Sequence, residues 1–186
     1  MQIKMPSETT ISEHMSEILK WALCAFLLGA PIGLAHNFRP NVAGGSEVHA
    51  PFPEIHDWNS LRITLNRSGC YGRCPAYRVE IHGDGTVLYD GKANVRTKGR
   101  KVAKISHTSL LQLVDVFRKA DYFSLDERYV AGVTDNPEYM SSISFDGLSK
   151  SILDYVGRNV GMPSGVSDVE AAIDHLSGAS KWVERK

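Results

Sequence analysis

The sequence predicts an α+β fold, in which an antiparallel sheet carries two helices on one face. Three observations lead to this prediction. Segments with alternating apolar residues are joined by Asp-Gly turns, two segments have helical apolar spacing, and the order along the chain is strands, helix, strands, helix. Strands and helices that are segregated in this way favour an antiparallel sheet covered on one side over a doubly wound parallel sheet.

The first strands form an expected meander. The segments 61–67, 76–82 and 85–91 alternate with period 2, and the last two are joined across the turn at Asp84-Gly85. A further extended segment, 93–105, completes the meander. The alternation places five side chains in the core, namely Tyr77, Val79, Ile81, Val87 and Tyr89.

Two helices and a second hairpin complete the predicted domain. One helix begins after Ser106 or His107, and a hairpin turns at Asp146-Gly147. The last helix is expected to take Ser167 as its N-cap, with Glu170 in its first turn. The side chains expected to be buried in these elements are Leu110, Leu111, Leu113, Val114, Phe117, Met140, Ile143, Phe145, Ile152, Tyr155, Val169, Ala172, Ile173 and Leu176.

An apolar segment near the N-terminus predicts export. Residues 21–35, WALCAFLLGAPIGLA, carry no charge and are too few to reach the roughly 20 residues that span a bilayer. Their length is close to the upper limit of the apolar part of a signal peptide, and Gly33 and Ala35 supply the small residues that precede a cleavage site. Translation from Met15 in place of Met1 would shorten an otherwise long and acidic leader.

The sequence therefore divides into a leader with an apolar helix at 1–35, a linker or irregular lead-in at 36–58, and one α+β domain at 59–186. An uncleaved anchor through residues 18–35 is the alternative to a cleaved signal, and a buried core helix is the third possibility. Either of the first two places the domain outside the cytoplasm, in the periplasm or on the inner membrane. The 21 basic and 21 acidic side chains cancel, which excludes a global field that would attract nucleic acid.

Cys70 and Cys74 are expected to form a structural disulfide. Export brings them into an oxidising compartment, and loss of the leader removes Cys24, which leaves one pair. Gly72 permits a tight turn between the two cysteines, and Pro75 opposes a helix after them. Closing a loop of about five residues should stabilise the domain by roughly 2 kcal/mol in the chain-entropy model.

Two other interpretations of the cysteine pair stay open. A redox-active dithiol would exploit a short, exposed disulfide, although such pairs are usually separated by two residues at a helix N-terminus. A zinc site would need two further ligands, and histidines such as His56 and His82 show no metal-like spacing. We therefore expect no metal and no cofactor.

Two polar segments could also carry function. The connection from Asp126 to Glu138 also contains Glu127 and Asp135, which could form a hydrolytic carboxylate pair or a calcium site, or could only solvate a loop. Residues 92–104 hold six basic side chains and no acid. We interpret this segment as an exposed edge strand whose charges block association, with an anion grip as the alternative.

The cysteines also carry a family resemblance. The motif Cys-x-Gly-x-Cys-Pro from Cys70, followed by Asp84-Gly85-Thr86-Val87, resembles a bacterial family known only as a domain of unknown function, typical of exported or envelope-associated proteins. The similarity extends from about Leu61 to Pro163, most of the mature chain. It implies the bounds of the domain and no catalytic residue.

The sequence favours an exported or envelope-associated domain that binds an envelope protein or a small ligand and performs no chemistry. The enzyme alternative is a thiol-disulfide redox activity at Cys70 and Cys74, or a hydrolytic activity in the loop from Asp126 to Glu138. No nucleic acid partner is expected, and residues 18–35 could tether the domain to a membrane.

Overall fold

A computed structural model describes residues 51–184, which belong to the unit that spans Ser46–Lys186. The predicted leader at 1–35, the tether at 18–35, the alternative start at Met15 and the first part of the lead-in lie outside the described residues. Between residues 51 and 184, no helix combines the length and the apolar character needed to cross a membrane.

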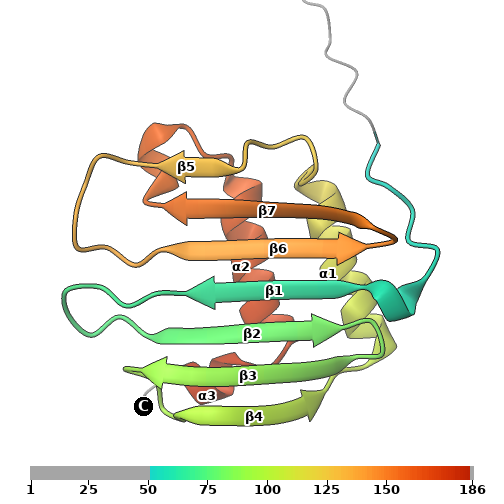
Figure 1. Ribbon diagram of the computed structural model, residues 1–186, viewed down its shortest axis with the longest axis horizontal. Coiled ribbons are helices and arrows are strands. Elements are labelled where there is room, and N and C mark those ends of the chain that lie inside the picture. Colours follow the sequence, from blue (N-terminus) through green and yellow to red (C-terminus); the bar gives the residue numbers. More distant parts are fainter. Residues whose placement is uncertain (1–50, 185–186) are drawn as a thin grey trace, which may run out of the picture. The chain divides into compact units, whose positions relative to one another are not determined.

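Seven strands form one sheet with the order β4-β3-β2-β1-β6-β7-β5 (Figure 1). Their bounds are β1 Arg62–Arg67, β2 Ala76–His82, β3 Thr86–Ala93, β4 Gly99–Lys104, β5 Arg128–Val130, β6 Tyr139–Phe145 and β7 Leu148–Tyr155. Neighbouring strands are antiparallel except β5, which runs parallel to β7. The expected meander and the second hairpin are confirmed, and the pairing of β1 with β6 joins them into one sheet.

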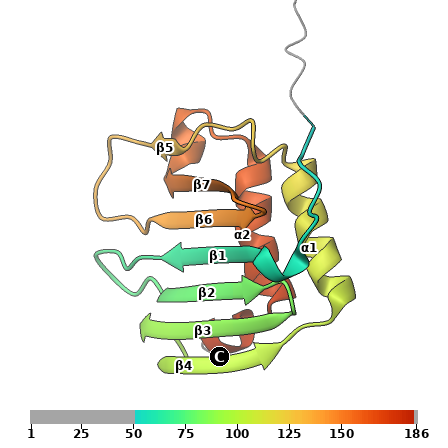
Figure 2. The same cartoon turned by 45° about the vertical axis from the view of Figure 1, so that its right-hand side comes forward.

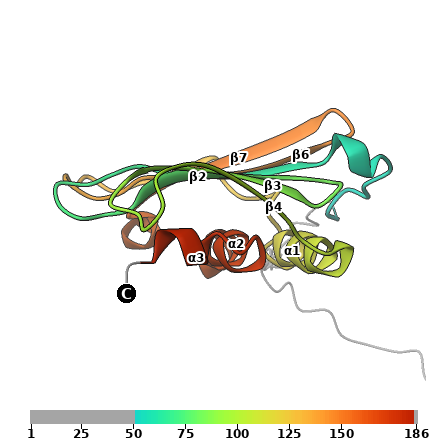
Figure 3. The same cartoon turned by 90° about the horizontal axis from the view of Figure 1, so that it is seen from below.

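The helices between residues 51 and 184 lie on the same face of the sheet (Figure 3). They are α1 His107–Lys119, α2 Ser164–Leu176 and the short α3 Ser180–Val183, and two 3₁₀ turns, η1 Trp58–Ser60 and η2 Gly157–Val160, complete the order. The predicted α+β class with helices on one face is confirmed, and α3 adds a third helix to the two that were expected. The hydrophobic core fills the space between the sheet and these helices.

The strands bury the side chains that their alternation predicted. Tyr77, Val79, Ile81, Val87 and Tyr89 are each at most 1% exposed. In the second hairpin, only some of the side chains predicted to be buried face the core. Ile143, Phe145 and Ile152 are buried as expected, whereas Met140 is 40% exposed. Tyr155 lies an odd number of residues from Ile152 and so faces the opposite side of the sheet.

Helix α1 begins where its cap predicts. The Ser106 hydroxyl accepts a hydrogen bond from the backbone N–H of Ser109 at 3.0 Å. The predicted stripe is buried except at Leu111, which is 44% exposed, since it follows the buried Leu110 by one residue and so points about a quarter turn away.

Helix α2 begins earlier than predicted. Ser167 is not its N-cap, because the helix starts at Ser164 directly after Pro163, whose backbone is extended. Val166 then opens the buried stripe of this helix. Glu170 consequently lies in the second turn and faces the core, with only 7% of its surface exposed.

Strand β5 was not predicted. Its three residues lie inside the connection between α1 and β6, where the sequence is too short to show an alternation. Tyr129, in the middle of the strand, is buried and lies opposite Asp154 of β7. Strand β4 lies at the other edge of the sheet, and its basic side chains are exposed. The predicted edge strand is therefore present in the second half of residues 92–104, whereas residues 92 and 93 end β3.

The lead-in packs on the domain before η1 begins. The Phe52 ring contacts those of Phe123 and Phe145, with centroids 5.3 and 5.9 Å apart. The Asp146 carboxylate accepts hydrogen bonds from the backbone N–H groups of His56 at 2.7 Å and Asp57 at 3.0 Å. In Figure 2 this segment runs beside α1. The packed structure therefore includes residues from Phe52 onward.

Candidate functional site

One end of the sheet carries a row of polar side chains on its helix-facing side. The register pairs Arg67 with Tyr77 on one side and with Tyr139 on the other, and Tyr139 in turn with Asp154. These four residues therefore lie side by side on the neighbouring strands β2, β1, β6 and β7. They lie at the end of the sheet where β1 stops in Figure 1. Each occupies a core-facing position of its strand, because side chains alternate. We call this set the end row.

Two acids of helix α2 face the end row. Glu170 and Asp174 lie four residues apart and so share one side of the helix. The Tyr77 hydroxyl donates a hydrogen bond to Oδ2 of Asp174 at 2.5 Å. We call Glu170 and Asp174 the α2 acids. Together with the end row, they bring three carboxyl groups and one guanidinium into the margin of the core.

Burial dominates the electrostatics of this cluster. It raises the pKa of Glu170 to about 8, and the negative charges of Asp154 and Asp174 act in the same direction. Burial also raises the pKa of Asp174, while its hydrogen bond from Tyr77 and the charge of Arg67 oppose the shift. For Glu170, Arg67 likewise lowers the pKa, but less than burial raises it. The cluster as a whole is thus poor in positive charge.

Three polar atoms of the cluster are buried without a hydrogen bond to any described residue. They are Nε of Arg67, Oε1 of Glu170 and Oδ1 of Asp174. A buried polar atom that lacks a partner typically costs about 1–3 kcal/mol. Proteins seldom keep such atoms without a reason, and a bound molecule is one way to satisfy them. The cluster is therefore our candidate site.

A cavity of about 640 Å³ opens on this cluster. Two of the three residues with unpartnered atoms, Arg67 and Asp174, line it. Its remaining lining comes from the loop between β1 and β2, from Asn94, and from α2 and the chain end: Arg73, Pro75, Asn94, Ala171, His175, Ser180, Val183 and Glu184. The volume lies in the range of pockets that hold small molecules.

The cysteine loop forms one wall of the cavity. The sulfur atoms of Cys70 and Cys74 lie at disulfide-bonding distance, and the Cα atoms are 5.5 Å apart, a separation that a disulfide spans without backbone movement. The Asn94 side chain donates hydrogen bonds to the carbonyl groups of Gly72 and Cys74, at 3.3 and 3.2 Å. The loop that carries Arg73 into the cavity lining is thus held on two sides.

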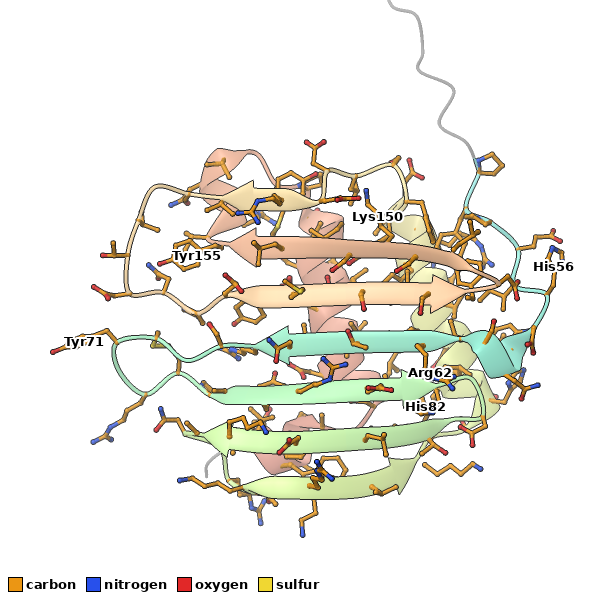
Figure 4. The ribbon with its side chains drawn as sticks, viewed as in Figure 1. His56, Arg62, Tyr71, His82, Lys150 and Tyr155 are labelled. Atoms are coloured by element: carbon orange, nitrogen blue, oxygen red, sulfur yellow. A yellow bond between two sulfur atoms is a disulfide. The ribbon has the colours of Figure 1, made fainter. Side chains whose placement is uncertain are left out.

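The surroundings of the two cysteines bear on the redox interpretation. They lie between the end of β1 at Arg67 and the start of β2 at Ala76, so neither cysteine begins a helix. The helix dipole that lowers the thiol pKa in many redox pairs has no counterpart here. Tyr71, at the tip of the loop, is 90% exposed and projects away from the sheet (Figure 4).

No metal site is built among residues 51–184, where no group of three or more His, Cys, Asp or Glu is placed to hold an ion. Of the histidines weighed as zinc ligands, His56 lies in the lead-in and His82 at the end of β2, next to Glu80 at 2.9 Å. Neither histidine lines the cavity next to the cysteine loop.

The four acidic residues of the loop from Asp126 to Glu138 contact the loop itself and the neighbouring strands. The backbone N–H of Asp126 donates a hydrogen bond to the Tyr129 hydroxyl at 3.1 Å. Glu127 lies 3.9 Å from Nζ of Lys150. Asp135 accepts a hydrogen bond from the neighbouring Thr134 hydroxyl. The backbone N–H of Glu138 donates to the Ser68 hydroxyl at 2.9 Å. These contacts brace the loop, and none of the four acids lines the cavity.

Sequence reasoning missed Arg67 and Asp174 and gave Glu170 only a place in a first helical turn. A signal was present for Arg67, which has the same parity along β1 as Ile63 and Leu65 and so must face the helices. No comparable sequence signal shows that its side chain lies near the α2 acids, because that proximity depends on how the helix crosses the sheet.

A comparison with protein families finds a match over residues 61–177, to a model described as a domain of unknown function, DUF6438. The match covers the strands of the sheet and the helices α1 and α2. A comparison with curated proteins found no match.

Proposed function

The chain belongs to this family, whose description names no activity, and from the site itself we propose that the domain binds a small polar ligand in the cavity and performs no chemistry on it. One observation carries the proposal. Arg67 and Asp174 both line the cavity, and each keeps one buried polar atom without a partner among the described residues. A ligand that pairs with these two side chains would offset part of the free energy lost by burying polar atoms without partners.

The lining gives less support to hydrolysis. His175 and Ser180 both line the cavity, but in the described part of the chain no hydrogen bond joins them. A serine nucleophile needs such a bond to a base for activation. The redox alternative at Cys70 and Cys74 lacks the helix N-terminus that usually lowers the pKa of the attacking thiol. Binding without catalysis is therefore the better-supported function.

The proposed place of action is outside the cytoplasm. The support is the uncharged run at 21–35 and the pair of cysteines that remains once it is removed. The intact mass of the native protein tests this directly. A mass that corresponds to a chain starting after residue 35, and lower by two protons for one disulfide, is expected. A full-length chain with both thiols titratable would contradict export.

The binding proposal is tested by thermal unfolding of the full chain in the presence of single amino acids, sugars, nucleotides and inorganic anions. Two variants decide whether a shift comes from the cavity. Ala171→Trp places a large side chain in the lining, whereas Asp168→Trp places the same side chain on an exposed position of α2 outside it.

At least one of these compounds should raise the midpoint of the wild type and of Asp168→Trp by several degrees, and should leave Ala171→Trp unchanged. The absence of any shift across the whole panel, or a shift that survives in Ala171→Trp, would contradict the proposal.

A further inference from the structure

We infer that the ligand of this cavity is a small zwitterion of the amino acid or short peptide class, whose carboxylate binds Arg67 and whose ammonium group binds Asp174. The inference rests on the proposed function and adds the chemical class of the ligand. It follows from three features of the cavity: opposite charges on two walls, the missing bond between them, and the size of the space.

The cavity has a basic wall and an acidic wall. Arg67 reaches it from the end of β1 and Arg73 from the cysteine loop, so the sheet side is basic. Asp174 reaches it from α2, and Glu184 follows α3 at the end of the described chain. A guanidinium presents several N–H donors that suit a carboxylate, and a carboxylate accepts from an ammonium group.

No ion pair joins the two walls among residues 51–184. Within residues 51–184, neither Arg67 nor Asp174 takes part in an ion pair, and each keeps a buried atom without a hydrogen bond. Oδ2 of Asp174 already accepts a hydrogen bond from the Tyr77 hydroxyl, whereas Oδ1 has no hydrogen bond to a described residue. Opposite charges that share a cavity without touching leave room for a molecule that carries both complements.

Ligands with one kind of charge fit this arrangement less well. A simple anion would gain the guanidinium groups of Arg67 and Arg73 but would meet the carboxylate of Asp174, and a simple cation would meet the reverse. A cation beside Oδ1 would also offset the burial that raises the pKa of Asp174. Only a ligand with both charges gains on both walls.

The remaining lining suits the rest of such a molecule. Pro75, Ala171 and Val183 add apolar surface to the same cavity. A volume of about 640 Å³ accommodates an amino acid with a large side chain or a short peptide, and pockets of this size commonly combine apolar walls with a few placed polar groups.

Three matched mixtures test the inference by titration calorimetry with the full chain. The first contains free amino acids and dipeptides, the second the same compounds acetylated at the amine, and the third the same compounds amidated at the carboxylate. Free compounds should bind the wild type at least about tenfold more tightly than either blocked set, because each block removes one charge-assisted contact.

Variants of Asp174 and Arg67 then test which side chain binds the ammonium group and which binds the carboxylate. In Asp174→Asn, the preference for free over acetylated compounds should fall to about one, while the preference over amidated compounds stays. In Arg67→Gln, the preference for free over amidated compounds should fall to about one, while the preference over acetylated compounds stays. Arg78→Gln, which removes a charge from the opposite face of β2, should behave as the wild type. A variant that merely misfolds would lose both preferences together, and its unfolding curve would show it.

Two outcomes would overturn the inference. Equal binding of free and acetylated compounds by the wild type would show an anion site. A failure of all three mixtures, together with a cavity-dependent shift by another compound in the thermal panel, would show another ligand class. In both cases the proposed binding function stands. It falls only if the entire panel fails or if the shift survives in Ala171→Trp.

Discussion

Tyr77 on β2 and Asp174 on α2 are joined by a hydrogen bond of 2.5 Å that links the sheet to the helix layer at the edge of the core. The two residues lie 97 positions apart in the sequence. The bond occupies Oδ2 of Asp174 and leaves Oδ1 without a hydrogen bond to any described residue. Burial, the charge of Asp174 and this bond together hold the pKa of Tyr77 well above its ordinary value, so the hydroxyl stays a donor.

Replacement of Tyr77 by Phe should lower the free energy of unfolding by about 1–2 kcal/mol, because it leaves a second oxygen of Asp174 without a partner. Urea denaturation at neutral pH measures the loss. Tyr71→Phe removes the same hydroxyl from a residue that is 90% exposed and serves as the control, with no change expected. Equal stability of Tyr77→Phe and wild type would show that the bond adds nothing.

The regular part of the fold could be predicted from the sequence because the strands β1, β2 and β3 each show an alternation of apolar and polar residues. Ile63 and Leu65 alternate with polar residues, and the core positions of β2 and β3 follow in the same way. Asp84 and Asp146 mark the two tight turns, and Ser106 marks the start of α1. Such signals act over a few residues and need no knowledge of the remaining structure.

The candidate site was not accessible in this way. The end row exists because β1 pairs with both β2 and β6, and the pairing with β6 joins segments about 70 residues apart. The strand β5, three residues long, depends on β7 for its hydrogen bonds. Glu170 was misplaced because Ser167 offers a good cap in the sequence, while the backbone of Pro163 starts the helix earlier. Long-range pairing decides the end row and the position of β5, whereas the backbone before Ser164 decides where α2 starts.

The stability of the domain should depend on pH through Glu170. Its pKa is raised from 4.5 to about 8, chiefly by burial, so the folded state binds more protons than the unfolded chain between these values. Stability should therefore be greatest below about pH 4.5 with respect to this group, and should decline as pH rises through 8.

Glu170→Gln should remove this decline, since the amide stays neutral, and should be more stable than the wild type by about 1–3 kcal/mol at high pH. Urea denaturation at mildly acidic and at alkaline pH measures the difference. Glu127→Gln, at an exposed position of the loop before β5, is the control and should keep the wild-type slope. A Glu170→Gln variant with an unchanged slope would assign the pH dependence to other groups.

The cysteine loop should stabilise the domain when oxidised. The variant with Cys70→Ser and Cys74→Ser should unfold at a lower urea concentration under oxidising conditions, with a loss of about 2 kcal/mol for a loop of this length. Under reducing conditions the variant and the wild type should agree. An unchanged midpoint, together with a wild-type insulin reduction activity that the variant lacks, would favour the redox enzyme instead.

Asp146 should hold the lead-in on the domain. Its carboxylate accepts hydrogen bonds from the backbone N–H groups of His56 and Asp57 and from the Ser60 hydroxyl, and these bonds lower its pKa. In Asp146→Ala, the N–H groups of His56 and Asp57 should exchange with deuterium faster. The thermal midpoint should fall by a few degrees, because only the aromatic contacts of Phe52 then hold the lead-in on the domain.

Asp168→Ala removes an exposed acid from α2 and is the matched control. Exchange at His56 and Asp57 should stay at the wild-type rate in this control. The N–H groups of His56 and Asp57 lie before η1. Faster exchange at these groups in Asp146→Ala alone would show that the bonds to Asp146 make the lead-in part of the stable domain. Equal exchange in both variants would show that the aromatic contacts of Phe52 are sufficient to hold the segment.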